Sequence, residues 1–231
     1  MNKVQIFPSV LAADFTRLGE EINAVETVKA DGLHLDIMDG HFVPNITFGP
    51  PVVESIRRTT KLFLSAHLML DDPGMFIKPF RQAGADAITI HPEIKDDWIA
   101  LIEKIHDLGI EAGIAINPET PVETIEAAKD KIDRILMMSV HPGFGGQNFM
   151  METVDKIVNL ERNIRSWNKK PLLEVDGGIN EKTIPAVVKA GINVLIMGSA
   201  IFRKDDAGAA LVKLRKQAND IYEEASGKRN L

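Results

Sequence analysis

The sequence predicts an α/β protein, a single (β/α)8 (TIM) barrel with eight parallel strands. Short apolar runs of β-forming residues alternate with longer amphipathic stretches along the whole chain. The length of 231 residues suits one such barrel, and no Ser/Gly-rich or charged linker divides the chain. Eight repeats of a strand followed by a helical stretch favour a closed barrel over an open, doubly wound sheet.

The expected strands are short and fairly evenly spaced, and they cover residues 4–10, 32–37, 62–68, 86–90, 110–116, 134–140, 171–176 and 193–197. The amphipathic stretches between them include residues 15–29, 98–108, 122–131, 151–167 and 182–190. We expect a catalytic barrel over residues 1–222 and a frayed polar tail over residues 223–231.

The composition excludes several classes of function. The net charge of −6 and the pI near 5.6 argue against nucleic acid or an anionic membrane as the main partner. The absence of cysteine excludes disulfides, thiolate metal sites and a cysteine nucleophile. The first residues lack the apolar core of a signal peptide, and no apolar run is long enough to cross a membrane. We therefore expect a cytoplasmic protein with no membrane partner and no nucleic-acid partner.

Polar side chains gather at the C-terminal ends of the expected strands, where (β/α)8 barrels carry their chemistry. His34 and Asp36 share one face of the second strand, His67 lies near the end of the third, and Asp176 is at the tip of the seventh. Two imidazoles and two carboxylates from three strands predict a divalent metal site suited to zinc, iron(II), manganese or cobalt.

The two aspartates in this group also predict acid–base chemistry. Carboxylates on opposite sides of a planar intermediate could remove a proton from one face and return one to the other, which inverts a stereocentre. A divalent metal that chelates the carbonyl and the adjacent hydroxyl would acidify the C–H bond and stabilise an enediolate.

Glycine-rich segments follow the last three expected strands, at residues 141–147, 176–180 and 198–202. Barrels of this kind commonly bind phosphate with the loops after the seventh and eighth strands and the start of a short helix. Glycine allows backbone N–H groups to approach an anion closely. The three segments together predict a phosphorylated ligand.

Other polar residues have simpler interpretations. His41, His91 and His141 follow strand ends and could line the site, but we expect them to form hydrogen bonds within loops. We expect His106 to lie on the solvated face of a helix. Glu174 shares a face with Asp176, so it either orients a metal ligand from outside the site or is turned elsewhere by strand twist.

The motifs HLDIMDGHFVPNITFGP, AHLM, MSVHPGFGGQ, LEVDGGI and GSAIF resemble the ribulose-phosphate 3-epimerase family. The resemblance extends from FPSVLAADF near the start to GSAIF, essentially the whole barrel. It implies an isomerase that inverts C3 of a ketose phosphate, D-ribulose 5-phosphate to D-xylulose 5-phosphate, through a cis-enediolate. It also implies one divalent metal per subunit (Zn²⁺ or Fe²⁺, or else Mn²⁺ or Co²⁺), no organic cofactor, and a dimer or hexamer.

Residue by residue, the resemblance implies metal ligands at His34, Asp36, His67 and Asp176, with Asp36 and Asp176 as the acid–base pair. It implies an apolar cap over the reaction site from Met38, Met69 and Met138. The residues expected to contact substrate are Ser9, His67, Gly143, Phe144, Gly145, Gly146, Gly177, Gly178, Gly198 and Ser199.

Four other assignments stay open. Allulose-6-phosphate 3-epimerase shares the fold and the chemistry, although the intact VDGGI and GSAIF motifs favour the pentose phosphate. A Schiff-base aldolase would need a lysine at a strand tip, and a related decarboxylase would need Asp-x-Lys-x-x-Asp where this chain has Asp36-Ile37-Met38-Asp39. A non-catalytic phosphosugar-binding barrel could keep the glycine loops, but it would not need both aspartates.

Overall fold

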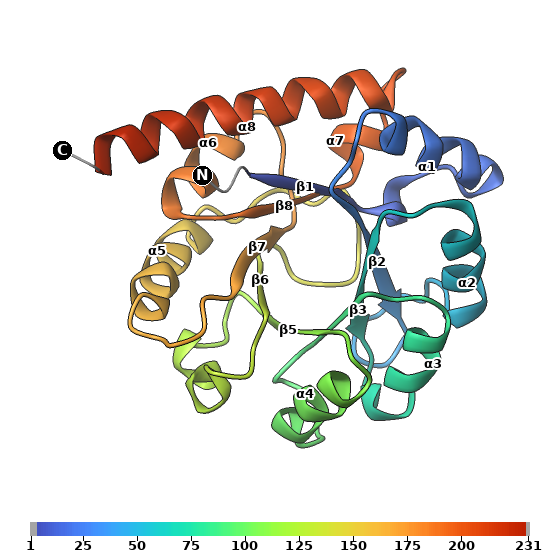
Figure 1. Ribbon diagram of the computed structural model, residues 1–231, viewed down its shortest axis with the longest axis vertical. Coiled ribbons are helices and arrows are strands. Elements are labelled where there is room, and N and C mark those ends of the chain that lie inside the picture. Colours follow the sequence, from blue (N-terminus) through green and yellow to red (C-terminus); the bar gives the residue numbers. More distant parts are fainter. Residues whose placement is uncertain (1–3, 230–231) are drawn as a thin grey trace.

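Eight parallel strands form one sheet that curls into a barrel in the computed structural model, which describes residues 4–229 (Figure 1). The strand order is β1-β8-β7-β6-β5-β4-β3-β2. An isolated parallel bridge between Ser9 and His34 joins the two ends of this order. The strands are β1 Gln5–Pro8, β2 Gly32–Met38, β3 Phe63–Met69, β4 Ala87–Ile90, β5 Glu111–Ile116, β6 Arg134–Met138, β7 Leu172–Asp176 and β8 Val194–Met197. The predicted fold and all eight predicted strands are confirmed.

Helices surround the barrel and cover its outer face (Figure 1). The α-helices are α1 Leu18–Thr27, α2 Pro50–Thr59, α3 Ile77–Gln82, α4 Trp98–Asp107, α5 Thr153–Ile164, α6 Ile184–Ala190, α7 Ser199–Phe202 and α8 Ala207–Arg229. Short 3₁₀ helices are η1 Val10–Ala12, η2 Phe15–Arg17, η3 Pro73–Met75 and η4 Val122–Ala128. No helix among residues 4–229 is long and apolar enough to cross a membrane.

Two stretches differ from the sequence-based expectation. Of residues 122–131, Val122–Ala128 form the 3₁₀ helix η4 and the rest form a turn, so no α-helix is present there. The buried residues Val122, Ile125 and Ala128 recur every three residues, the period of a 3₁₀ helix. At the C-terminus, residues 223–229 continue helix α8 instead of leaving it as a tail, and residues 230 and 231 lie outside the described part of the chain.

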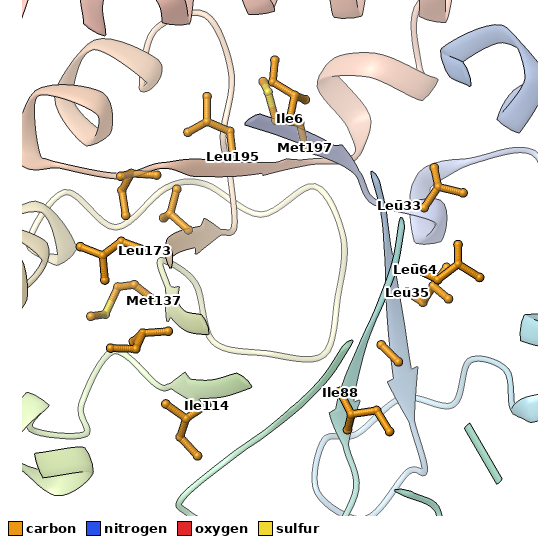
Figure 2. Close-up of a cluster of buried hydrophobic side chains, with 14 of the residues drawn as sticks. Ile6, Leu33, Leu35, Leu64, Ile88, Ile114, Met137, Leu173, Leu195 and Met197 are labelled. Atoms are coloured by element: carbon orange, nitrogen blue, oxygen red, sulfur yellow. The ribbon is translucent and has the colours of Figure 1, made fainter. Parts of the chain in front are cut away.

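The alternation of side chains along each strand separates the core from the site. In β2, Leu33, Leu35 and Ile37 point outward into the layer between barrel and helices, while His34 and Asp36 point inward. Figure 2 shows this outer layer, in which side chains from successive strands point away from the barrel axis. Since burial of a large apolar side chain contributes about 1.5–3 kcal/mol, this layer holds the barrel in shape.

A buried ion pair fills the barrel interior at the N-terminal end of the strands. Arg134 on β6 donates from Nε to Glu174 Oε1 at 2.6 Å and from Nη1 to Glu111 Oε2 at 2.7 Å. Its guanidinium also lies 5.2 Å from the ring centre of Phe7 and 5.1 Å from that of Phe63. Glu174 therefore neutralises Arg134 and does not orient a metal ligand, which decides between the two interpretations of its position.

Candidate active site

Four side chains converge at the C-terminal end of the barrel. One potential ligand atom from each of His34, Asp36, His67 and Asp176 lies within 4.8 Å of the others. His34 Nε2 is 3.3 Å and His67 Nδ1 is 3.5 Å from Asp36 Oδ1, and the two ring nitrogens are 3.4 Å apart. Strands β2, β3 and β7 supply these groups because their inward positions reach the mouth of the barrel together.

The donor set fits a divalent metal. Both histidines are fully buried and direct one ring nitrogen each toward the Asp36 carboxylate. Two imidazole nitrogens and two carboxylates match the ligands that zinc, iron(II), manganese and cobalt accept. Two neighbouring carboxylates in a buried site are costly unless a cation compensates them.

The surroundings of Asp36 and Asp176 shift the pKa values of these two carboxyl groups in opposite directions. Burial and the adjacent Asp36 charge raise the pKa of Asp176 to about 7. Burial acts against ionisation of Asp36 as well, but the charges and hydrogen bonds of His34 and His67 outweigh it and hold the pKa of Asp36 well below its ordinary value. Near neutral pH, Asp36 is therefore ionised, whereas Asp176 is partly protonated and able to give a proton.

The two histidines also differ. Burial lowers the pKa of His67 to about 3, so this ring is neutral. Burial acts in the same direction on His34, but the charge and hydrogen bond of Asp36, with the charge of Asp176, prevail and raise the pKa of His34. A neutral imidazole is the form that binds a metal.

Two hydroxyl groups hold Asp36 in place. Ser9 donates from Oγ to Asp36 Oδ2 at 2.7 Å. Thr47 Oγ1 donates to the Asp36 carbonyl at 2.6 Å and accepts from the Met38 N–H at 3.0 Å. Ser9 is among the expected site residues, whereas Thr47 lies in an irregular segment after β2 and has no sequence signal.

A pocket opens above the four-residue cluster and collects most of the residues predicted to contact substrate. Asp36 and Asp176 line it together with Ser9, Met38, Met69, Met138, Gly143, Phe144, Gly145, Gly146, Gly177, Gly178, Gly198 and Ser199. His67 was also expected to contact substrate, but it is fully buried and is not among the lining residues. Its position supports a role as a ligand from below the pocket.

Apolar groups surround the carboxylates on one side. Met38 and Met69 are buried and pack with Val43, and Met138 packs with Val140 inside the barrel. All three methionines line the pocket beside the aspartates. This apolar surface contributes to the burial that raises the pKa of Asp176.

The backbone conformation after β7 favours glycine at two positions. Gly177 has a φ of +117° and Gly178 a φ of +66°, a region that other residues rarely adopt. A Cβ at Gly178 would lie 2.4 Å from the backbone nitrogen of Phe149, so the loops after β6 and β7 are in direct backbone contact. Close packing of these two loops shapes the far side of the pocket.

Side chains also hold the loop after β6. Gln147 Nε2 donates to the carbonyls of His141 at 2.7 Å and Phe144 at 3.0 Å. Asn45 Nδ2 donates to the Gly143 carbonyl at 2.7 Å, which ties the segment after β2 to this loop. The ring of Phe144 remains exposed, with 56% of its surface accessible. The loop is therefore ordered around an exposed aromatic ring at the pocket entrance.

The expectation for His91 was incomplete, because this residue follows β4 but also contacts the candidate metal cluster. His91 is fully buried, and its Nε2 lies 2.8 Å from His67 Nε2. Its Nδ1 lies 3.1 Å from Glu93 Oε2. The signal was present in the sequence, since Ala87, Thr89 and His91 continue the inward alternation of β4. The expectation for His106 was also incomplete, because its Nε2 lies 2.7 Å from Asp133 Oδ2.

Comparisons with known proteins identify the family of the chain. Residues 5–202 match the model of the ribulose-phosphate 3-epimerase family. The chain is 45% identical over 213 residues to ribulose-phosphate 3-epimerase from Bacillus subtilis (strain 168), covering 92% of this chain and 98% of that protein. It is 41% identical over 216 residues to the cytoplasmic isoform of ribulose-phosphate 3-epimerase from Oryza sativa subsp. japonica, covering 92% and 93%.

More distant solved structures share the fold. KGPDC from Streptococcus mutans superimposes with a TM-score of 0.69 at 15% identity, covering 96% of this chain and 98% of that chain. The match to the family model and the identity to its members decide the assignment: the chain belongs to the ribulose-phosphate 3-epimerase family.

Proposed function

We propose that this protein interconverts D-ribulose 5-phosphate and D-xylulose 5-phosphate by a two-base transfer of a proton at C3. The observation that carries the proposal is the pair Asp36 and Asp176. Both line one pocket, and the protein environment drives their pKa values in opposite directions. Groups whose surroundings separate their pKa values in this way are suited to act as base and acid at one carbon.

His34, Asp36, His67 and Asp176 would hold one divalent metal, with Zn²⁺ or Fe²⁺ as the first candidates and Mn²⁺ or Co²⁺ as alternatives. When bound, such an ion would supply Lewis-acid stabilisation for negative charge on the substrate oxygens. No organic cofactor is needed for this chemistry.

The aspartates would divide the proton transfer between them. One carboxylate takes the C3 proton from one face of the sugar, and the C–H electron pair moves into the carbon framework as the C2 carbonyl becomes an enediolate oxygen. The other carboxylic acid returns a proton to the opposite face of C3. The carbonyl forms again, and the configuration at C3 is inverted.

Other residues of the pocket would position the substrate. The phosphate would be held by backbone N–H groups of Gly177, Gly178, Gly198 and Ser199, which lie together at the pocket wall. Ser9 would contact the sugar near Asp36, and residues 143–146 would cover it from the loop after β6. Met38, Met69 and Met138 would keep water away from the enediolate.

The pocket also bears on the lyase alternative. A Schiff-base aldolase needs a lysine near the carbonyl carbon. Among the described residues that line the pocket there is no lysine.

We propose in addition that the protein acts in the cytoplasm as a homodimer or homohexamer, with a small phosphorylated ketose as its partner rather than nucleic acid or a membrane.

Proton NMR in D₂O tests the function directly. Metal-loaded protein is incubated with D-ribulose 5-phosphate in one tube and with D-allulose 6-phosphate in another. Faster conversion of the pentose phosphate, with deuterium incorporated at C3, supports the proposal. Preference for the hexose phosphate keeps the mechanism and changes the substrate, and absence of exchange with either sugar contradicts both. A third tube, treated with a chelator and then resupplied with Zn²⁺ or Fe²⁺, should lose the activity and regain it.

A further inference from the structure

We propose that His91 and Glu93 are positioning residues that fix the tautomer of His67, so that the lone pair of His67 Nδ1 points into the four-residue cluster. This inference rests on the proposed metal site. It concerns groups outside the pocket, since neither His91 nor Glu93 is among the residues that line it. They act through His67, which they would hold ready for a metal ion.

The three side chains form a continuous line from the barrel interior to the loop after β5. His67 presents Nδ1 to Asp36 and Nε2 to His91, whose Nε2 is 2.8 Å away. His91 presents Nδ1 to Glu93 Oε2 at 3.1 Å. The two rings meet edge to edge, with centres 5.0 Å apart and planes inclined by 25°. Both histidines are fully buried, so no bulk water competes for their nitrogens.

Glu93 sets the direction of the hydrogen bonds that join it to His91 and His91 to His67. Glu93 Oε1 accepts from the Asn117 backbone N–H at 3.1 Å and from the Thr120 hydroxyl. Burial opposes ionisation of Glu93, but these bonds and the contact with His91 hold its pKa below the ordinary value. An ionised carboxylate only accepts hydrogen bonds. His91 must therefore carry its proton on Nδ1.

The order of protons then follows from the chemistry of imidazole. A neutral ring with a proton on Nδ1 has an acceptor at Nε2. In this form His91 Nε2 accepts from His67 Nε2–H, and His67 keeps its lone pair on Nδ1. That nitrogen is the one that faces Asp36 and His34. Ligand histidines are commonly oriented by a hydrogen bond from their second nitrogen, and loss of the partner weakens metal binding.

The loop that ends the line is itself held. Lys156 on α5 donates to the carbonyls of Asn117 at 2.7 Å and Pro118 at 3.1 Å. The ring of Phe42 packs against His91 with centres 4.8 Å apart. His34 has no such arrangement: its Nδ1 is buried without a hydrogen-bond partner among the described residues. Control of the tautomer therefore acts on one of the two histidines of the cluster.

The substitution Glu93→Gln tests the direction of the line with almost no change of shape. The Asn117 N–H can only donate, so it selects the amide oxygen of Gln and turns the amide NH₂ toward His91 Nδ1. Every proton along the line is then reversed, and His67 Nδ1 becomes protonated. We expect affinity for Co²⁺, followed by its visible absorption during titration, to fall about 10–100-fold. The matched control is Glu119→Gln, an exposed carboxylate that pairs with His141 and should leave the affinity unchanged.

The protonation of His67 can also be read in the metal-free protein by long-range ¹H–¹⁵N NMR, which the small number of six histidines makes tractable. The unsubstituted protein should show a proton on His67 Nε2 and none on Nδ1, and Glu93→Gln should show the opposite. A proton on His67 Nδ1 in the unsubstituted protein, or equal Co²⁺ affinity of Glu93→Gln and the control, would overturn the inference. If the unsubstituted protein binds no metal, the proposed metal dependence fails, while the tautomer measurement still decides the role of His91 and Glu93.

Discussion

Ser9, which directly follows β1, donates a 2.7 Å hydrogen bond from Oγ to Oδ2 of Asp36 on β2. Both residues are buried, and the backbone of Ser9 bridges that of His34, the neighbour of Asp36 on the same strand face. The hydroxyl thus joins the closure of the barrel to one of the two proposed acid–base groups. Ser9 takes part in positioning the carboxylate as well as in lining the pocket.

Removal of this hydroxyl should reduce catalysis more than stability. Since a hydrogen bond to a charged group contributes about 1.5–3 kcal/mol, Ser9→Ala should lower kcat/KM for D-ribulose 5-phosphate about 10–100-fold. Steady-state kinetics measure the change. Ser55→Ala, which removes an exposed hydroxyl bonded to the Pro51 carbonyl on α2, serves as the control and should behave as the unsubstituted enzyme. Unchanged kcat/KM in Ser9→Ala would show that Asp36 does not depend on Ser9.

Loss of either proposed proton carrier should nearly abolish turnover. Asp36→Asn and Asp176→Asn each keep the size of the side chain but cannot exchange a proton at C3, so we expect kcat to fall by roughly 10³-fold or more. Deuterium incorporation at C3 should be lost together with turnover. Asp107→Asn, an exposed change on α4, is the matched control. Substantial activity in either site variant would contradict the two-base scheme, and metal analysis of both variants separates loss of the ion from loss of the proton carrier.

A methyl group at Gly178 should disturb the contact between the loops after β6 and β7. The added Cβ would lie 2.4 Å from the Phe149 nitrogen, so one of the two loops must shift. We expect Gly178→Ala to raise KM for the phosphorylated substrate about tenfold or more and to lower the melting temperature. Gly109→Ala is the control that separates the effect of a steric clash from the effect of backbone strain. Gly109 also has a positive φ of +71°, but a methyl group added there would meet no atom within 4 Å. Equal effects of the two substitutions on KM would refute the loop-contact explanation.

Removing one partner of the buried pair Arg134–Glu174 should lower the free energy of unfolding more than replacing both residues with apolar ones. Arg134→Met leaves the carboxylate of Glu174 buried without a partner, and we expect a loss of about 3–5 kcal/mol in the free energy of unfolding. Replacing both, as Arg134→Met with Glu174→Leu, removes the unpaired charge and should restore most of that stability. Urea unfolding of the two single variants and the double variant measures this. A double variant no more stable than Arg134→Met would show that the pair has another role.

Stability in mild acid should depend on Asp133. Burial raises the pKa of its carboxyl group, but Lys169, the Ala112 N–H and His106 prevail and lower it. With a folded-state pKa below the unfolded one, the stabilisation is fully present above about pH 4 and is lost as the pH falls through the folded-state pKa. Asp133→Asn should lower the free energy of unfolding by about 1–3 kcal/mol at pH 7, with a smaller deficit at pH 3. A constant difference between the two proteins over this pH range would contradict the assignment.

The alternation of residues in sequence was sufficient to place most of the site. His34, Asp36, His67 and Asp176 each follow the inward face of a strand, and parallel strands bring their C-terminal ends to one mouth, so proximity follows from the fold. The glycine segments after β6, β7 and β8 meet at the same pocket for the same reason.

Other features depend on contacts that no local pattern encodes. The role of His91 requires the ring of His67 from a different strand, and the orientation of Glu93 depends on Asn117 and Thr120 from the loop after β5. Thr47 lies in an irregular segment, and its contact with Asp36 becomes evident only in the folded chain. Likewise, the position of Glu174 is ambiguous in sequence because its partner Arg134 lies on a different strand.

The closure of the barrel has a consequence for its dynamics. Strands β1 and β2 lie at the two ends of the sheet order, and the backbone bridge from Ser9 to His34 spans them at the proposed metal cluster. A ligand that binds only the closed form stabilises it by RT ln(1 + [L]/Kd). Amide hydrogens along this seam should therefore exchange more slowly with solvent deuterium when the cluster is occupied. The residues proposed for catalysis would then also stabilise the junction of β1 and β2. The exchange rate of amide hydrogens at this junction would report the fraction of molecules with an occupied cluster.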